Sequence, residues 1–522
     1  MFRFPSNNKV VPQIQARVSQ ELAKQAPERN RPPWNTTWEQ IMSTSKRFPS
    51  FARPLKHSVA VLVLAGFSLI AAGCGGGGSS PATPPGGGQN PGPTPSSAAQ
   101  VKMGDAPADR VVSFEVTVGP ITLTPTSGSA VTALSATRRL ELSHLSGTNE
   151  PLALLNLPQG SYSSASITVS NPEVTFINSS GVLVKLQPAF NQAITINFSP
   201  AVSIGASSSV LNIDLNISNA LSFDAQGNVT GVNLSASSFN VSSSAVAAED
   251  RQGHEDGELE DMTGLVTNVS GTSFTMTVGQ NGVSLTFSTD ANTQFNDGAA
   301  LATMLNTLVT VEGLTKSDGS LYAKEVEGIE NANGAELEGL VTQVTGNPAS
   351  QLTFVAHDGS GSGVDDTAVG ATLTANVSGA QYKVNKGNID TSGIGGLPSP
   401  PNFPFDAATV HAGQRVEVET ASSFGGTSLV AEKVKLQQQA LVGTVSGLAG
   451  PTSAGPVTFT LTLPSDSAFA MLSGQTIVNV SWQPGTDLHN LASVNNGDTV
   501  RVRGLVFFTG SSFNMIARRI DQ

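Results

Sequence analysis

The side chains best suited to chemistry in this sequence are a single cysteine, Cys74, and six histidines. Cysteine and histidine are the usual zinc ligands, and histidine is the commonest general base. No histidine pair has the H-E-x-x-H or H-x-H spacing, so zinc would need residues from distant segments: His57, His144, His254, His357, His411 and His489. No G-x-S-x-G turn follows a predicted strand, and no phosphate-binding P-loop occurs. We therefore predict that the chain is not an enzyme, needs no cofactor and holds no catalytic metal.

The densest group of carboxylates lies in the segment AEDRQGHEDGELED, residues 248–261. Its spacing does not match the D-x-[DN]-x-[DN]-G loop that wraps calcium, so we interpret it as a solvated linker between domains. Weak binding of a divalent cation by this segment stays open as the alternative. Asp105 and Asp109, which flank Ala-Pro-Ala, could bind a metal, but aspartate in this setting more often stabilises a turn by accepting hydrogen bonds from nearby backbone amides.

Cys74 stands where an apolar run meets a glycine tract. Basic residues precede the run Val59–Ala72, which is shorter than the roughly 20 apolar residues of a membrane-spanning helix and has the build of a secretory signal. The sequence IAAGC at 70–74 resembles the bacterial lipobox, whose cysteine is lipidated and becomes the mature N-terminus. The resemblance implies a fatty-acid anchor such as palmitate on Cys74, and Gly75 in place of aspartate implies the outer membrane. The alternative is an ordinary signal peptide with an incidental cysteine.

The charge of the chain is unevenly distributed. Only 13% of the residues are charged, and the formal net charge is −12. Ten of the 27 basic and three of the 39 acidic residues precede Ser58, which leaves −19 from Cys74 onward. Nucleic acids are bound mainly by lysine and arginine, so we predict no nucleic-acid partner. We expect contact with a membrane through the lipid, and leave an envelope glycan or protein open as a further partner.

Composition divides the chain into segments. Glycine, serine and proline dominate residues 75–100 and cannot bury enough apolar surface to offset chain entropy. The predicted order is a disordered segment or misassigned start at 1–41, a lipoprotein signal peptide at 42–73, a tether at 74–100, a β-sandwich at 101–247, the acidic linker at 248–261, and β-barrel repeats at 262–331, 335–437 and 438–522.

The first folded region consists of short alternating runs separated by turn residues. VSFEVTV at 112–118 has apolar residues at every second position, as in a half-buried strand. Similar runs continue to residue 217, which is typical of a sandwich. VKMGDAPAD at 101–109 and LLNLPQGSYSSASITV at 154–169 resemble the bacterial lipoprotein module catalogued as domain of unknown function 4382. The second of these also resembles an edge of transthyretin-like sandwiches, so we expect a transthyretin- or Ig-like β-sandwich without a known activity.

The rest of the chain repeats one pattern three times. Each copy opens with G-x-V, a turn and an alternating strand, as in MTGLVTNVSGTSFTMTV at 262, LEGLVTQVTGNPASQLTFVA at 337 and LVGTVSGLAGPTSAGPVTFTLTL at 441. Three further alternating runs follow in each copy, and closing such a sheet into a barrel removes its exposed edges. The order resembles domain of unknown function 5666, whose repeats look like reduced OB-type barrels. We therefore expect an all-β protein with three small five-stranded barrels.

The repeats differ most between their third and fourth strands, where the loop at 385–413 is the longest. Loops on rigid scaffolds often carry binding function, which makes Tyr382, Phe403, Phe405 and Trp482 our candidates for ligand contact. The alternative is that Phe403 and Phe405 plug one end of a barrel. We expect a lipid-anchored cell-envelope protein that acts as a non-catalytic binding or structural module. A carbohydrate or divalent-cation binding protein of the periplasm or cell surface is the alternative function.

Overall fold

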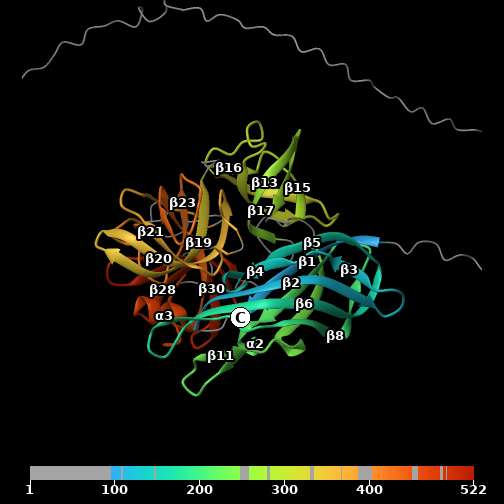
Figure 1. Ribbon diagram of the computed structural model, residues 1–522, viewed down its shortest axis with the longest axis horizontal. Coiled ribbons are helices and arrows are strands. Elements are labelled where there is room, and N and C mark those ends of the chain that lie inside the picture. The colour runs from blue at the N-terminus through green and yellow to red at the C-terminus, as the bar shows by residue number, and fades with distance from the viewer. Residues whose placement is uncertain are drawn as a thin grey trace, which may run out of the picture. The chain divides into compact units, whose positions relative to one another are not determined.

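The computed structural model describes the chain from Ser96 to the C-terminus, apart from residues 107–109, 146–148, 247–257, 279–282, 330–333, 366, 386–388, 390–402, 450–456, 483–485 and 489–490 (Figure 1). Cys74, the predicted signal, most of the tether and part of the loop at 385–413 lie outside the described residues. The regular secondary structure of the described part is almost all β-strand, with two short α-helices, α2 (Ile217–Ala220) and α3 (Ala468–Ser473). The predicted all-β fold is therefore confirmed. None of the helices in the described part is long and apolar enough to cross a bilayer.

The first folded region is a sandwich of two sheets. One sheet has the order β12 (Phe239–Ala245), β9 (Ser209–Asn216), β1 (Ser96–Ala106), β5 (Asn149–Pro158). The other has the order β3 (Val131–Leu134), β2 (Val111–Pro125), β6 (Gly160–Ile177), β7 (Leu183–Leu186), with β4 (Arg138–Glu141) on β2 and β8 (Asn191–Ile204) on β6. The short elements η1 (Ser143–Leu145), η2 (Ala236–Ser238), β10 (Leu221–Phe223) and β11 (Val229–Val232) connect or flank these strands.

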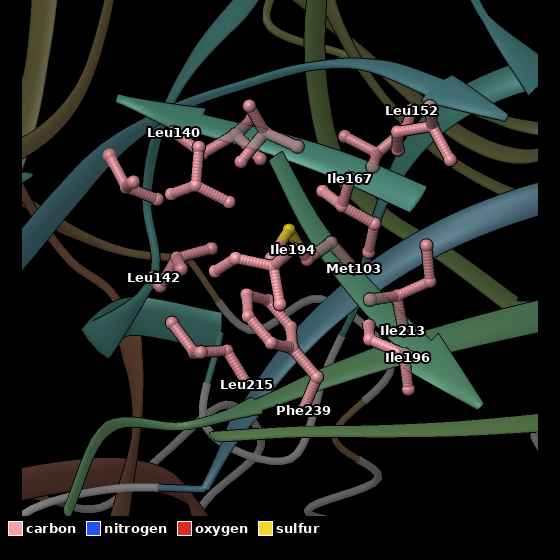
Figure 2. Close-up of a cluster of buried hydrophobic side chains, with 14 of the residues drawn as sticks. Met103, Leu140, Leu142, Leu152, Ile167, Ile194, Ile196, Ile213, Leu215 and Phe239 are labelled. Carbon is pink, nitrogen blue, oxygen red and sulfur yellow. The ribbon is translucent and has the colours of Figure 1, made fainter. Parts of the chain in front are cut away.

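One hydrophobic core joins the two sheets of the sandwich. Figure 2 shows Met103 and Ile213 from the first sheet meeting Ile167 and Ile194 from the second. The apolar side of each alternating strand supplies these residues, as the period of two requires. Strand β1 begins at Ser96, inside the segment that the composition assigns to the tether, and it pairs with both β5 and β9.

Strand β2 differs from the expected half-buried strand because both of its faces are covered. Ser113 and Glu115, on the polar side of the alternation, are 0% and 1% exposed. The second repeat lies against this side: Nε2 of His357 is 2.7 Å from the carbonyl oxygen of Val112. Gly370 has a φ of +74°, and a Cβ there would overlap the carboxylate of Glu115, so this position favours glycine. The alternation of apolar and polar residues along a strand predicts which face is polar, but it does not predict whether another domain covers that face.

Two of the three repeats close into five-stranded barrels. The first runs β15 (Val283–Ser288), β14 (Ser273–Val278), β13 (Glu258–Ser270), β17 (Leu308–Thr315), β18 (Leu321–Gly328), closed by β15 on β18, with β16 (Gln294–Asn296) beside β18. The third runs β28 (Ile477–Trp482), β27 (Val457–Thr462), β26 (Gln438–Ala449), β30 (Thr499–Phe508), β31 (Phe513–Asp521), closed by β28 on β31, with β29 (Asp487–Leu488) beside β31.

The second repeat has the same strand order, but its last strand is divided. Its sheet runs β22 (Gln381–Val384), β25 (Lys433–Leu436), β23 (Arg415–Thr420), β19 (Ala335–Gly346), β20 (Ala349–Gly361), β21 (Thr372–Asn376), β24 (Ser428–Val430). β24 and β25 together occupy the place that β18 has in the first repeat, with Ala431 and Glu432 between them. The amides of both residues donate hydrogen bonds, to Asn376 and to Glu419, so the backbone stays paired across the break.

The second and third repeats share a hydrophobic core. Leu505, Phe507 and Ile516 of the third repeat belong to the same buried cluster as Phe354 and the other core residues of the second. The ring of Phe403 lies 5.5 Å from that of Phe507, centroid to centroid. These two repeats therefore form one packing unit.

Candidate functional site

The structure brings together three of the four residues that the sequence suggests for ligand contact. The rings of Tyr382 and Phe405 meet edge to face with centroids 5.6 Å apart, and Phe403 lies against Phe507. All three belong to or pack against the core of the second repeat, and Phe405 is buried. The Tyr382 hydroxyl has no hydrogen-bond partner among the described residues, and burial, then the charge of Asp406, raises the pKa of Tyr382 to about 12.

Trp482 lies apart from these three, on β28 of the third repeat. Its ring meets that of Phe459 edge to face at 6.4 Å, and it packs against the core of that repeat. A role in ligand contact stays a prediction for all four residues. Lipidation stays a prediction too, because Cys74 lies outside the described residues.

A cavity of about 130 Å³ opens where the sandwich meets the second and third repeats. Its walls are mainly apolar and include Val111 of β2, Leu340 of β19, Leu441 of β26 and Phe469 of α3. Its polar lining residues are Ser143, His144, His357, Arg415, Gln439 and Ser467. Apolar walls with a few convergent polar groups are the usual composition of a small-molecule site.

Glu141, at the end of β4, fixes one side of this cavity. Its Oε2 accepts a hydrogen bond from Nδ1 of His144 at 2.9 Å, and its Oε1 accepts one from the Ser143 hydroxyl at 2.6 Å. The backbone amides of Phe114, Ser143 and His144 also donate to this carboxylate. Burial alone would raise the pKa of Glu141, but His357 and the hydrogen bonds from His144 and Ser143 lower it to about 2. The carboxylate is therefore ionised and held in one orientation.

The same contact orients His144. Burial lowers the pKa of His144, but the hydrogen bond and charge of Glu141 raise it by more, so the net shift is upward. Because Nδ1 donates to Glu141, Nε2 is the ring nitrogen left for other contacts.

His357, on β20, offers a buried acceptor beside His144. The two rings are stacked with centroids 6.2 Å apart. Nε2 of His357 donates to the carbonyl oxygen of Val112, so in the neutral ring Nδ1 carries the lone pair, and it has no hydrogen-bond partner among the described residues. Burial lowers the pKa of His357 to about 4, which keeps the ring neutral at pH 7. An unpaired buried acceptor costs free energy that a donor on a ligand or water would recover.

A glutamate–histidine pair beside a cavity is also the arrangement of a general base. Here, however, the Ser143 hydroxyl donates to Glu141 and not to His144, so it is not activated as a nucleophile. The geometry of the described residues therefore favours binding over acyl transfer. The sequence offered one signal for this site, the three-residue spacing of Glu141 and His144, and none for His357, which another domain supplies.

A second polar group lies on one face of the second repeat, which we call the charged face. Alternate residues of three adjacent strands form it: Glu336 and Glu338 of β19, Arg415, Glu417 and Glu419 of β23, and Lys433 and Lys435 of β25. The register sets Glu336 opposite Glu419, Glu338 opposite Glu417, and the two lysines opposite the glutamates of β23. The sequence carried this signal as the alternations ELE, RVEVE and KVK.

Comparison with known proteins matches part of the chain to a family. Residues 263–327 match the family described as Domain of unknown function (DUF5666), which confirms the expected resemblance for the first repeat. No curated protein matches the chain. A similar solved structure, "drosophila Unr CSD456", is 10% identical, with 50% of this chain and 96% of that chain covered and a TM-score of 0.12. A multidomain protein with nucleic acid binding domains from Streptococcus pneumoniae is 11% identical, with 49% and 72% covered and a TM-score of 0.10.

These matches contradict the prediction that the chain has no nucleic-acid partner, and we withdraw that exclusion. It depended on the net charge of the whole chain, which does not determine the charge of any single surface. At such low TM-scores the matches do not themselves assign nucleic-acid binding to this chain.

Proposed function

We propose that the chain is a non-catalytic binding protein of the bacterial cell envelope, anchored by lipid on Cys74. Its ligand is a small ring that bears hydroxyl groups, such as a sugar unit of an envelope glycan. The observation that carries the proposal is the 130 Å³ cavity with the unpaired Nδ1 of His357 and the oriented ring of His144. A cavity of that size accommodates a ring of roughly six to eight non-hydrogen atoms.

The ligand chemistry follows from the groups in the cavity. Nδ1 of His357 accepts a hydrogen bond, so the ligand must present a donor such as a hydroxyl. The apolar side chains of Leu340, Leu441 and Phe469 suit the face of a ring. Arg415 and Gln439 provide donors for hydroxyl or ring oxygens.

We further propose that the sandwich is a module of the domain of unknown function 4382 type, and that the second and third repeats belong with the first. The support for the repeats is their strand order, which is the same as in the matched segment.

Replacing His357 with phenylalanine is expected to weaken sugar binding, because it removes the buried acceptor Nδ1, together with the hydrogen bond from Nε2 to Val112, while keeping an aromatic ring. A panel of neutral and amino monosaccharides is titrated into the full chain by calorimetry, and a binder of the native protein should lose at least about tenfold in affinity. His411→Phe is the control, since His411 lies outside the cavity, against Phe508 and Phe513. A sugar that binds H357F and the native chain equally would disprove the site, and no binding by the whole panel would reject the sugar class.

Replacing Cys74 with alanine is expected to remove both lipid and membrane association. Two or three acyl chains hold a protein firmly, at about 0.8 kcal/mol per buried CH₂. Mass spectrometry of the mature N-terminus and membrane fractionation should lose the acyl mass and the membrane pool together. A native chain without acyl mass, or a C74A variant that still sediments with membranes, would contradict the anchor.

A further inference from the structure

We propose that Glu336, Glu417 and Glu419 of the charged face form a calcium-binding site. One carboxylate oxygen of each residue lies within 4.8 Å of the other two. Calcium–oxygen distances of 2.3–2.6 Å put the ligands of one ion up to about 5 Å apart, so a single ion can contact all three.

Glu336 is the residue that requires a ligand. It is 7% exposed, and its Oε1 has no hydrogen-bond partner among the described residues. The other carboxylates around it have cations within ion-pair distance: Glu338 has Arg415, Glu419 has Lys433, and Glu417 has Lys435. A buried carboxylate without a cation or donor is strongly disfavoured in its ionised form.

A small cavity of about 30 Å³ lies next to Glu336. Glu338, Asp358 and Glu417 also line it, together with the hydroxyls of Thr263 and Thr310 from the first repeat. That volume holds about one water or one cation. The lining therefore supplies charged and neutral oxygens around a space of the right size, and Glu419, which does not line the cavity, would complete the three-carboxylate cluster.

The charge balance of the face favours a divalent cation. The face holds four carboxylates and three cations, and Asp358 adds a further carboxylate to the cavity lining: Glu336, Glu338, Glu417 and Glu419 against Arg415, Lys433 and Lys435. A divalent ion would offset this excess of carboxylates.

The donor atoms favour calcium over transition metals and magnesium. All are oxygens, and neither histidine nor cysteine is among the three ligands, which selects hard cations. Calcium takes six to eight oxygen ligands in flexible geometry, whereas magnesium demands octahedral geometry and is rarely bound by an all-protein set of ligands. Glu417 and Glu419 can contact Lys435 and a metal ion at the same time, because a carboxylate has about four lone-pair positions that can accept.

The test is calcium titration of the full chain after treatment with EDTA, followed by calorimetry and by the melting temperature. We expect one calcium ion per chain and a higher melting temperature with calcium. Glu336→Gln keeps the shape of the side chain and should weaken calcium binding about tenfold or more. If that variant does not fold, Glu419→Gln removes a different ligand and should have the same effect.

Glu173→Gln in the sandwich is the matched control, because Glu173 is also 7% exposed and pairs with Lys185. It should bind calcium with the native affinity. The proposal is overturned if the native chain gives neither binding heat nor a melting shift with calcium. It is equally overturned if E336Q binds like the native chain, which would locate the ion elsewhere, for example in the acidic segment 248–261.

Discussion

Replacing Lys435 with methionine is expected to lower the free energy of unfolding by about 3–5 kcal/mol. The side chain is 3% exposed, and its Nζ lies 2.6 Å from Glu327, 2.8 Å from Glu419 and 3.1 Å from Glu417. Methionine fills much of the same volume but leaves these buried carboxylates without their shared cation. Burial would lower the pKa of Lys435, and the surrounding carboxylates more than reverse this, so the lysine is charged in the native protein.

Urea unfolding of the full chain measures this loss, with Lys383→Met as the control. Lys383 lies on the neighbouring strand β22 and pairs with Asp297 at 3.2 Å, but its side chain is 38% exposed. A pair this exposed contributes less than about 1 kcal/mol, so K383M should unfold close to the native midpoint. Equal losses in the two variants would mean that burial of the ion pair does not determine its contribution.

The Lys435 variant should also weaken the contact between the first and second repeats. Glu327 belongs to β18 of the first repeat, whereas Glu417 and Glu419 belong to β23 of the second. Hydrogen exchange should therefore accelerate on the strands of both repeats in K435M.

Replacing Phe507 with alanine is expected to lower the free energy of unfolding by about 3–5 kcal/mol and to destabilise two repeats at once. Phe507 is fully buried on β30 of the third repeat, yet it belongs to the core of the second. The cavity left by its ring would remove the support for Phe403. Hydrogen exchange should accelerate on β20 and β21 of the second repeat as well as on β30.

Phe459→Ala is the matched control for this variant. Phe459 is 3% exposed and belongs to the separate core of the third repeat. F459A should lower the free energy of unfolding by a similar amount, but it should leave hydrogen exchange in β20 and β21 unchanged. If F507A and F459A gave the same exchange pattern, the shared core would not couple the two repeats.

Much of the fold was predictable because strand periodicity and repetition are local properties. The alternation at 112–118 became part of β2, and the three G-x-V patterns became β13, β19 and β26, which all lie at the centre of their sheets. The interruption of the last strand at Ala431 was not predictable, because LVAEKVKL reads as one continuous strand. Whether a strand stays whole depends on the partners on both sides, which periodicity does not encode.

The candidate site was much less predictable because its residues come from different modules. Glu141 and His144 are neighbours in sequence, but His357 and Arg415 reach the cavity only after the sandwich and the second repeat dock. The charged face was visible as alternating charges, yet alternation alone is typical of a solvated strand face. In the structure the first repeat covers that face, through contacts such as Lys435 with Glu327, so its charges are buried and not solvated.

The core shared by the second and third repeats also limits which fragments of the chain can fold and which repeats can be duplicated separately. A fragment ending at Gln437 would retain Phe354 and Leu337 but lose Phe507, Leu505 and Ile516, so it would present an open apolar surface to water. Recombination that copied the second repeat alone would create the same defect. The second and third repeats must therefore be duplicated or exchanged together, and a chimera that transfers only one of them should be destabilised.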